Sequence, residues 1–273
     1  QCGNLSSVTL PESLVSIGQS AFSLCTSLTS VVVPKNIKTI ETGTFRGCSS
    51  LTNIVLPDSL VTIGESAFQG CGMSQIRIPD NVSVFGSYAF RECVNLTSVT
   101  IPKSMAHIAY GAFYGCSNMT SVTIPEGVTT IEHNAFHLCN LLSLSLPQSL
   151  TTIAGEGSST GAFSANKNLS VVVIPDNVTT IVGGAFAGCT SLKTIVFGAN
   201  VTTLGAGMLR GCTSLTEVSL PKKLTIIPNS CFLGCPALSK VILPEGLTTI
   251  EGYAFQDCSS LQTIQLPSTI RVM

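Results

Sequence analysis

Hydrophobic and polar positions along this chain recur with a period of 23 residues. Two consecutive stretches, CTSLTSVVVPKNIKTIETGTFRG (residues 25–47) and CSSLTNIVLPDSLVTIGESAFQG (residues 48–70), carry cysteine, leucine, proline, isoleucine and phenylalanine at the same offsets. The shared pattern is C-x-x-L-x-x-V-x-[IL]-P-x-x-[VL]-x-x-I-x-x-x-A-F-x-x. A unit of this size cannot bury its apolar face alone, so the pattern predicts a solenoid in which successive repeats stack.

The repeats begin at a column of cysteines in which one asparagine substitutes. It defines twelve repeats, the last of them incomplete, which start at Cys2, Cys25, Cys48, Cys71, Cys93, Cys116, Cys139, Asn166, Cys189, Cys212, Cys235 and Cys258. The step is 22 residues after Cys71 and 27 after Cys139, where AGEGSSTG (residues 154–161) indicates an insertion loop. The pattern spans residues 1–273, so we expect a single domain. Because the chain starts and stops inside a repeat, we expect it to be a fragment of a longer protein, without caps.

Each repeat is expected to contain short extended segments rather than a helix. The segment LTSVTIP (residues 96–102) alternates apolar and polar residues, which is typical of a short strand with one buried face. Proline then ends the strand, since it cannot donate a ladder hydrogen bond. The segment VTTI (residues 128–131) supplies a second extended piece. We therefore predict a mainly β solenoid of about 12 repeats. It has one short parallel strand per repeat in a continuous sheet on one face, and short extended or 3-10 segments on the other.

Stacking also predicts columns of equivalent residues inside the solenoid. The phenylalanine column runs from Phe22 to Phe255 and is interrupted only by Leu209. Near that residue Gly198 replaces the strand-ending proline. These two changes predict locally altered packing, or a bend.

The stretch LTSVTIPEGVTTIEHNAFHLC resembles the BspA-type leucine-rich repeats of bacterial surface proteins and of mucosal protists such as trichomonads. The resemblance covers essentially the whole chain. It implies a leucine-rich-repeat solenoid in an extracellular, cell-surface protein that adheres to host matrix, host cells or other microbes. It implies no catalytic residues.

The cysteine column is interpreted as filling, with one small apolar residue per turn kept as a buried free thiol. Disulfides between some neighbours stay an alternative, because a surface protein lives in an oxidising compartment. Against them, stacked side chains point the same way rather than at each other. Cys231 lies outside the column, at a position that alanine occupies in most repeats, and is expected to face inward.

Composition and motifs exclude several classes of function. Only 10% of residues are charged and the net charge is −1, so no basic surface for nucleic acid or membrane lipid is predicted. Apolar runs are too short for direct membrane insertion. No nucleophile elbow, phosphate loop or carboxylate pair is present, so we expect no enzyme, no catalytic residue, no cofactor and no metal. His133 and His137 lack a third metal ligand and are interpreted, with His107, as surface histidines.

The outward positions of the strands are the predicted binding face, for a protein or glycan ligand. Val171, Val173 and Val196, beside Thr194, form an apolar cluster that indicates a partner site, or alternatively ordinary strand composition. The insertion residues Gly157, Ser158 and Ser159 are a second candidate, or a tolerated flexible excursion. Arg77 and Lys240 supply sparse charge on the same face, and Glu217 the remainder.

The predicted function is a non-enzymatic adhesion module on the cell surface that binds through the outward face of its sheet. A rigid spacer that presents another domain is the alternative hypothesis, and an ice- or crystal-surface binder is a third. Seven N-x-S/T sequons are possible glycosylation sites in a eukaryotic secreted protein and would be inert in a bacterial one: Asn4, Asn81, Asn95, Asn118, Asn168, Asn177 and Asn200.

Overall fold

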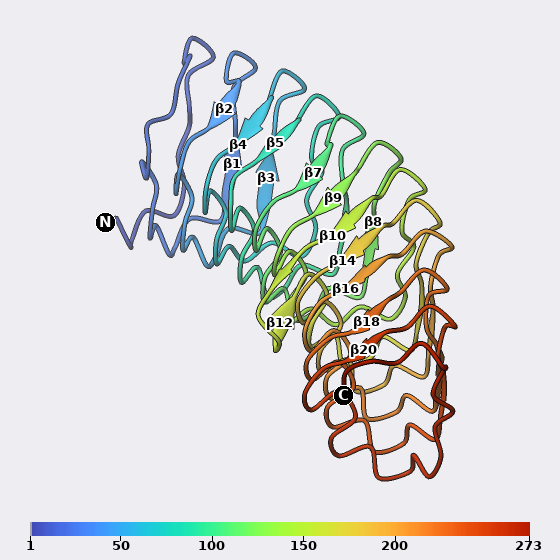
Figure 1. Ribbon diagram of the computed structural model, residues 1–273. Coiled ribbons are helices and arrows are strands. Elements are labelled where there is room, and N and C mark those ends of the chain that lie inside the picture. Colours follow the sequence, from blue (N-terminus) through green and yellow to red (C-terminus); the bar gives the residue numbers. More distant parts are fainter. Residues whose placement is uncertain (1) are drawn as a thin grey trace.

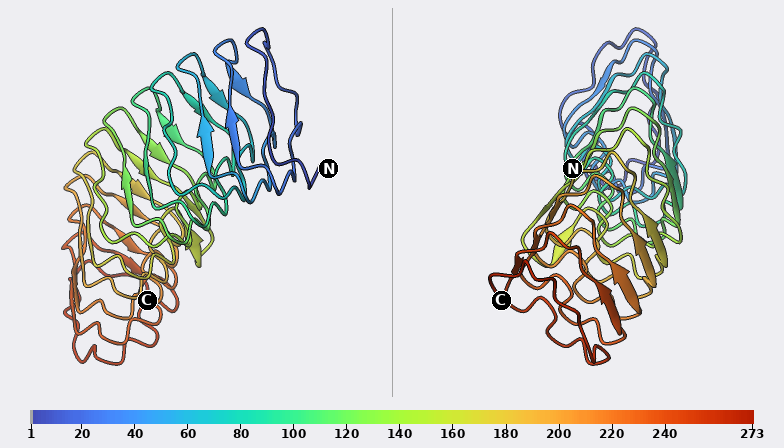
Figure 2. Two further views of the ribbon diagram at one scale, coloured as in Figure 1. Left: turned by 180° about the vertical axis from the view of Figure 1, so that it is seen from behind. Right: turned by 45° about the vertical axis from the view of Figure 1, so that its right-hand side comes forward.

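A computed structural model describes residues 2–273 as a stack of β turns along a curved axis, with the N- and C-terminal turns at opposite ends (Figures 1 and 2). The described residues contain no helix. Two series of short strands run along the stack, and every pairing between turns is parallel. The prediction of a mainly β solenoid with parallel strands is therefore confirmed.

The first series consists of three-residue strands formed by the segment that precedes the proline. They are β1 (Ser30–Val32), β3 (Asn53–Val55), β6 (Ser98–Thr100), β8 (Ser121–Thr123), β13 (Val171–Val173), β15 (Thr194–Val196), β17 (Glu217–Ser219) and β19 (Lys240–Ile242). The central residue points inward and its two neighbours outward. This alternation follows from the period-2 geometry of a strand.

The predicted continuous sheet of these strands is wrong. The ladder is divided into four pairs, β1–β3, β6–β8, β13–β15 and β17–β19. Residues 75–77 and 143–145, at the equivalent positions, are not strands. In both of these repeats the segment from cysteine to proline, Cys71 to Pro79 and Cys139 to Pro147, is one residue shorter than in the others. The missing residue changes the approach to the strand position, and the ladder is interrupted there.

The second series consists of two-residue strands in the segment that follows the proline. They are β2 (Thr39–Ile40), β4 (Thr62–Ile63), β5 (Val84–Phe85), β7 (His107–Ile108), β9 (Thr130–Ile131), β10 (Thr152–Ile153), β14 (Thr180–Ile181), β16 (Thr203–Leu204), β18 (Ile226–Ile227) and β20 (Thr249–Ile250). They form sheets in the orders β2-β4-β5, β16-β14-β10-β9-β7 and β18-β20. The segments predicted to be merely extended thus form the longest sheet.

Stacked aromatic rings run through the core. From Phe22 to Phe186, neighbouring rings of the phenylalanine column lie 5.2–5.6 Å apart and within 16° of parallel. Leu209, also fully buried, interrupts the stack before the Phe232–Phe255 pair. At Gly198 a Cβ would lie 2.2 Å from the Pro175 carbonyl oxygen. The ring stack is therefore interrupted at Leu209, while the altered packing or bend predicted for this region stays a prediction.

Most repeats turn back through two residues in the left-handed backbone region, five positions and one position before the cysteine, whereas the turn before Asn166 has only Ala165 in this region. Glycine occupies both in some repeats, as at Gly43 (φ 61°) and Gly47 (φ 72°). Elsewhere larger residues adopt the same conformation, such as Asn134 (φ 58°) and Leu138 (φ 57°). A non-glycine residue pays a steric penalty in this region, so the turn is imposed by the neighbouring turns.

The cysteine column is buried and also forms hydrogen bonds. All described cysteines are free thiols, and all but Cys2 are buried, including Cys231. Nine thiols donate to a backbone carbonyl of an earlier turn, for example Cys71 Sγ to Phe45 O at 3.1 Å and Cys116 Sγ to Phe90 O at 3.2 Å. Burial raises the pKa of the Cys93 and Cys139 thiols to about 12. The reactive thiolate is therefore disfavoured, and the column is structural.

Candidate interaction surfaces

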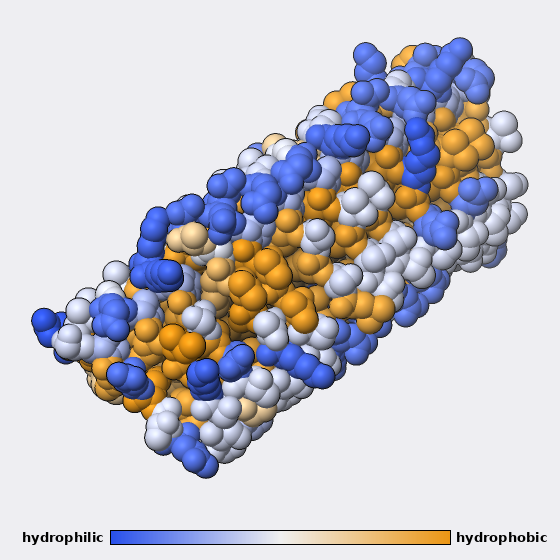
Figure 3. All heavy atoms as spheres, turned by 90° about the vertical axis from the view of Figure 1, so that its right-hand side faces the viewer, coloured by the Kyte–Doolittle hydropathy of each residue, from blue (hydrophilic) through white to orange (hydrophobic). Residues whose placement is uncertain are grey.

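Strands β13 and β15 bring the predicted apolar cluster together. Val173 pairs with Val196 and Val171 pairs with Thr194 in the parallel register. The three valine side chains are 49–56% exposed, so they present apolar surface to solvent. We call Val171, Val173, Thr194 and Val196 the valine patch. An apolar band, bordered by hydrophilic side chains, runs along one side of the molecule (Figure 3).

The charged candidates are paired and lie on other turns. Arg77 Nη1 lies 3.0 Å from the Asp58 carboxylate, and Lys240 Nζ lies 3.8 Å from that of Glu217, which is its register partner in β17–β19. Both pairs are largely exposed, so solvent screens them and they contribute little to stability. Neither charge belongs to the valine patch.

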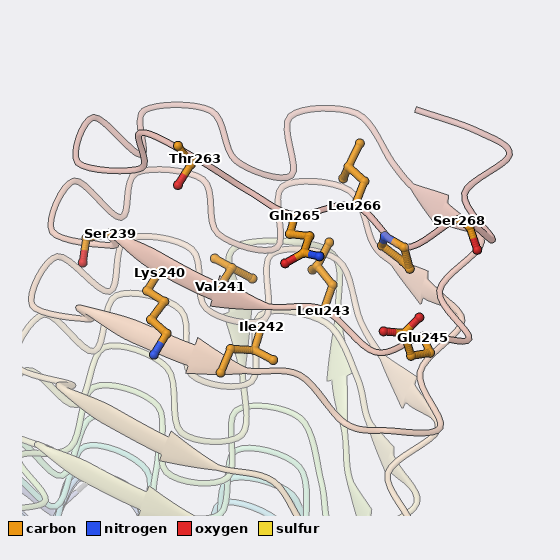
Figure 4. A pocket seen from close by; sticks show the side chains of 11 residues that line it. Ser239, Lys240, Val241, Ile242, Leu243, Glu245, Thr263, Gln265, Leu266 and Ser268 are labelled. Atoms are coloured by element: carbon orange, nitrogen blue, oxygen red, sulfur yellow. The ribbon is translucent and has the colours of Figure 1, made fainter.

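Lys240 instead lines a groove of about 500 Å³ near the C-terminal end of the stack (Figure 4). The groove lies between β19 and residues 263–268, with Ile242 and Gln265 among its lining residues. Residues 263–265 occupy the strand position of the last repeat but form no strand. The groove arises because this segment does not pair with β19.

The insertion is an ordered β-hairpin rather than a flexible excursion. Strands β11 (Gly155–Glu156) and β12 (Thr160–Gly161) pair antiparallel, and the hairpin lies on the inner side of the curve (Figure 1). Gly157, Ser158 and Ser159 form its tip. On one side it lies close to turns further along the chain, where a Cβ on Gly207 would lie 1.8 Å from Ser158 O. These contacts involve neither β13 nor β15, so the hairpin and the valine patch are separate features.

The interpretation of His133 and His137 as surface histidines is wrong. Both are buried, with 7% and 9% of their surface exposed. The His133 ring contacts the hairpin, because the Glu156 N–H donates to Nδ1 at 2.7 Å and Thr160 Oγ1 lies 3.5 Å from Nε2. His137 Nδ1 contacts the carbonyl and hydroxyl oxygens of Ser164. His107, the third histidine, is exposed as expected.

Sequence reasoning missed this histidine contact, although a signal was present. The register between these turns is 22 residues, since Ile131 pairs with Ile153, so Glu156 lies one residue beyond the position equivalent to His133 in the next turn. The inserted hairpin then covers the ring. Burial lowers the pKa of both His133 and His137, and the nearby Glu156 carboxylate partly opposes the effect at His133.

The sequon asparagines fill hydrogen-bonding positions between turns. Four of them donate through Nδ2 to the preceding turn: Asn81 to Asp58 O, Asn95 to Gly72 O, Asn168 to Asn140 Oδ1 and Asn177 to Gln148 O. Asn200 accepts from Lys223 Nζ at 2.7 Å. The amide serves the contact between turns at these offsets, and in other repeats a hydroxyl takes its place, as Ser104 Oγ does in donating to Asp80 O.

Two further features complete the description of residues 2–273. They include no group of three or more histidine, cysteine or acidic side chains arranged to hold a metal ion. They also include no helix with the length and apolar character that crossing a bilayer requires.

The repeat length, the paired strands and the buried leucine, isoleucine and phenylalanine columns define a leucine-rich-repeat solenoid. The chain belongs to the BspA-type leucine-rich repeat family. The sequence profile described as "BspA type Leucine rich repeat region (6 copies)" matches residues 1–96, 38–159 and 156–273. No functionally curated protein matches the chain.

Solved structures of several bacterial proteins share this fold. A leucine rich cell surface protein from Faecalibacterium prausnitzii is 28% identical, with a TM-score of 0.63 over 97% of this chain and 82% of that one. A leucine-rich repeat protein from Eubacterium ventriosum is 25% identical, with a TM-score of 0.55 over 89% and 80%. One from Bacteroides ovatus is 23% identical, with a TM-score of 0.50 over 99% and 92%.

Proposed function

We propose that this chain is a non-enzymatic adhesion module of a cell-surface protein, which binds a protein or glycan on a host cell, in extracellular matrix or on another microbe. The observation that carries the proposal is the valine patch, where three half-exposed apolar side chains adjoin on paired strands. Membership of a repeat family with a cell-surface relative supports the location.

The valine patch suits a contact because its geometry is set before a partner arrives. The strands are held in register, and the central residues Val172 and Ile195 are buried beneath the patch. A preorganised surface of β-branched side chains loses little entropy on binding. Residues at the centre of an interface typically contribute most of its affinity, whereas exposed charge pairs such as Arg77–Asp58 contribute little.

The test is a double variant, Val173→Asp with Val196→Asp, assayed for binding to epithelial cells, matrix proteins and intact bacteria. Binding at the valine patch should weaken at least about tenfold, because two central apolar contacts become carboxylates. The matched control is Thr100→Asp with Thr123→Asp, since this pair occupies the equivalent positions and register in β6–β8. Both variants place two like charges side by side and carry a similar structural cost.

Three outcomes are distinguishable. Loss in the valine variant alone supports binding at the patch. An equal loss of binding in both variants means either that binding occurs elsewhere on the face or that the substitutions damage folding. Circular dichroism distinguishes these two explanations. If the unaltered chain binds nothing in the panel, the adhesion proposal fails and the rigid spacer is favoured.

A further inference from the structure

The hairpin formed by β11 and β12 is tied to the preceding turn by one side chain, His133. The Glu156 N–H donates to Nδ1 from one hairpin strand, and Thr160 Oγ1 faces Nε2 from the other. Among the described residues, 155–160 form no other hydrogen bond to the rest of the solenoid. The attachment therefore depends on the state of this imidazole.

The contact fixes which nitrogen carries the proton. Because the Glu156 N–H donates to Nδ1, Nδ1 must be an unprotonated acceptor, and the single ring proton lies on Nε2 toward Thr160. An imidazolium carries a proton on both nitrogens, so it would direct an N–H at the Glu156 N–H. His137 differs, since its Nδ1 faces the carbonyl and hydroxyl oxygens of Ser164, so a proton on Nδ1 finds an acceptor there.

On its other side the hairpin lies close to the backbone of three glycines. A Cβ on Gly183 would lie 2.5 Å from Gly157 O, and one on Gly184 would lie 2.6 Å from Thr160 N. Gly207 contacts the hairpin tip in the same way. These glycines, which we call the glycine strip, let the hairpin approach closely but offer it no side chain and no hydrogen bond in the described structure.

Few titratable groups surround the His133 ring. The Tyr110 ring lies 5.4 Å away in the preceding turn, and Glu132 Oε2 is engaged by the Tyr110 N–H. Glu156 lies on the hairpin and His137 on the same turn as His133, while the glycine strip contributes none. Burial lowers the pKa of His133. The His133 contact therefore stabilises the docked hairpin fully at pH values above the ordinary histidine pKa of about 6.5. This stabilisation declines as the pH falls below that pKa, and it levels off once His133 is also protonated in the docked hairpin.

We propose that the hairpin is a pH-operated latch, in which protonation of His133 removes the acceptor for the Glu156 N–H and releases residues 155–160 from the inner side of the curve. Release uncovers the glycine strip while the stacked core remains folded, since the His133 side chain bonds only to the hairpin and the backbone bond from Gly111 N to His133 O is independent of the ring. The device is independent of the valine patch and of the proposed adhesion function.

Hydrogen–deuterium exchange of the intact chain tests the latch at about pH 7.5 and about pH 5. After correction for intrinsic rates, the protection of peptides spanning 154–162 should fall about tenfold on acidification, as expected for one lost buried hydrogen bond. Peptides that contain Phe113 and Phe136 should keep their protection. His133→Gln, whose amide oxygen accepts a hydrogen bond at both pH values, should abolish the change, while His137→Gln should retain it.

Nuclear magnetic resonance of the unaltered protein provides a second measurement that needs no variant. The imidazole nitrogen shifts should report an Nε2–H tautomer for His133 at neutral pH, with titration matching the loss of hairpin protection. An Nδ1–H tautomer, equal hairpin protection at both pH values, or an unchanged response in His133→Gln would each overturn the latch.

Discussion

Asn166, the one residue that replaces a cysteine of the column, offers the sharpest test of how the turns are held together. It is fully buried. Its Nδ2 donates to Phe136 O at 2.9 Å and Phe163 O at 2.8 Å, and its Oδ1 accepts from Leu141 N at 3.0 Å. The cysteines elsewhere form only the bond equivalent to Phe136 O, so the asparagine has an additional role.

That role follows from the shortened segment between Cys139 and Pro147. In a regular repeat the second residue after the cysteine donates to the preceding turn, as Ser50 N does to Thr26 O. The equivalent N–H here, on Leu141, is satisfied by Asn166 instead. Asn166 therefore supplies the acceptor for Leu141 N in this shortened segment.

Asn166→Ala should leave the Leu141 N–H and the Phe136 carbonyl buried without partners, while Phe163 O retains the Cys189 thiol. At about 1–3 kcal/mol for each orphaned group, the expected loss is about 2–6 kcal/mol. Asn166→Cys should restore the bond to Phe136 O and lose only about 1–3 kcal/mol. Cys189→Ala is the control, since Phe163 O keeps its bond to Asn166.

Urea unfolding followed by circular dichroism gives these differences from the midpoint, provided that the slope is unchanged. Because repeat arrays can unfold in parts, hydrogen exchange near Leu141 should locate the loss. The reasoning is refuted if Asn166→Ala costs less than about 1 kcal/mol, or if Asn166→Cys costs as much as Asn166→Ala.

Three further predictions concern the column, the hairpin and the thiols. Phe113→Ala should lower the free energy of unfolding by about 3–5 kcal/mol, measured with urea, since its ring is buried between two stacked neighbours; a loss below about 1 kcal/mol would contradict this. Gly207→Ala should raise hydrogen exchange in residues 155–160, whereas Gly246→Ala, with open space around it, should not. In the folded protein a thiol reagent should modify Cys2 rapidly, and all twelve cysteines only after denaturation without reductant; several fast thiols would refute their burial.

The repeated features of the fold were predictable because the residues that form them recur in almost every repeat. The inward positions of Val99, Ile131 and Phe113 recur at fixed offsets, so their burial could be inferred from the period alone. The thiol hydrogen bonds were not predicted, although the column was. Cysteine fits the column by its size, and its Sγ also donates to a carbonyl of an earlier turn. The composition of the repeat reveals the fit by size but not the hydrogen bond.

The candidate site was predictable only in part. Val173 and Val196 could be paired from the 23-residue spacing of their repeats, and the register confirms it. The sparse charge of Arg77, Lys240 and Glu217 is predicted from the sequence, but the ion pairs with Asp58 and Glu217 are not, because they depend on side-chain reach between turns.

The structural features that the 23-residue period could not predict occur where the repeat length changes. The largest changes in length belong to one repeat. Between Cys139 and Asn166 the chain loses one residue before the proline and gains a hairpin after it. The loss removes a front strand, and the Asn166 amide accepts the hydrogen bond of the Leu141 N–H in that repeat. The gain buries His133 against Glu156 and requires glycine in the next two turns, at Gly183, Gly184 and Gly207. Each compensation lies in an adjacent or nearby turn, because residues in a solenoid contact only their neighbours. A departure in repeat length is therefore best interpreted together with the turns on either side of it, where its structural consequences lie.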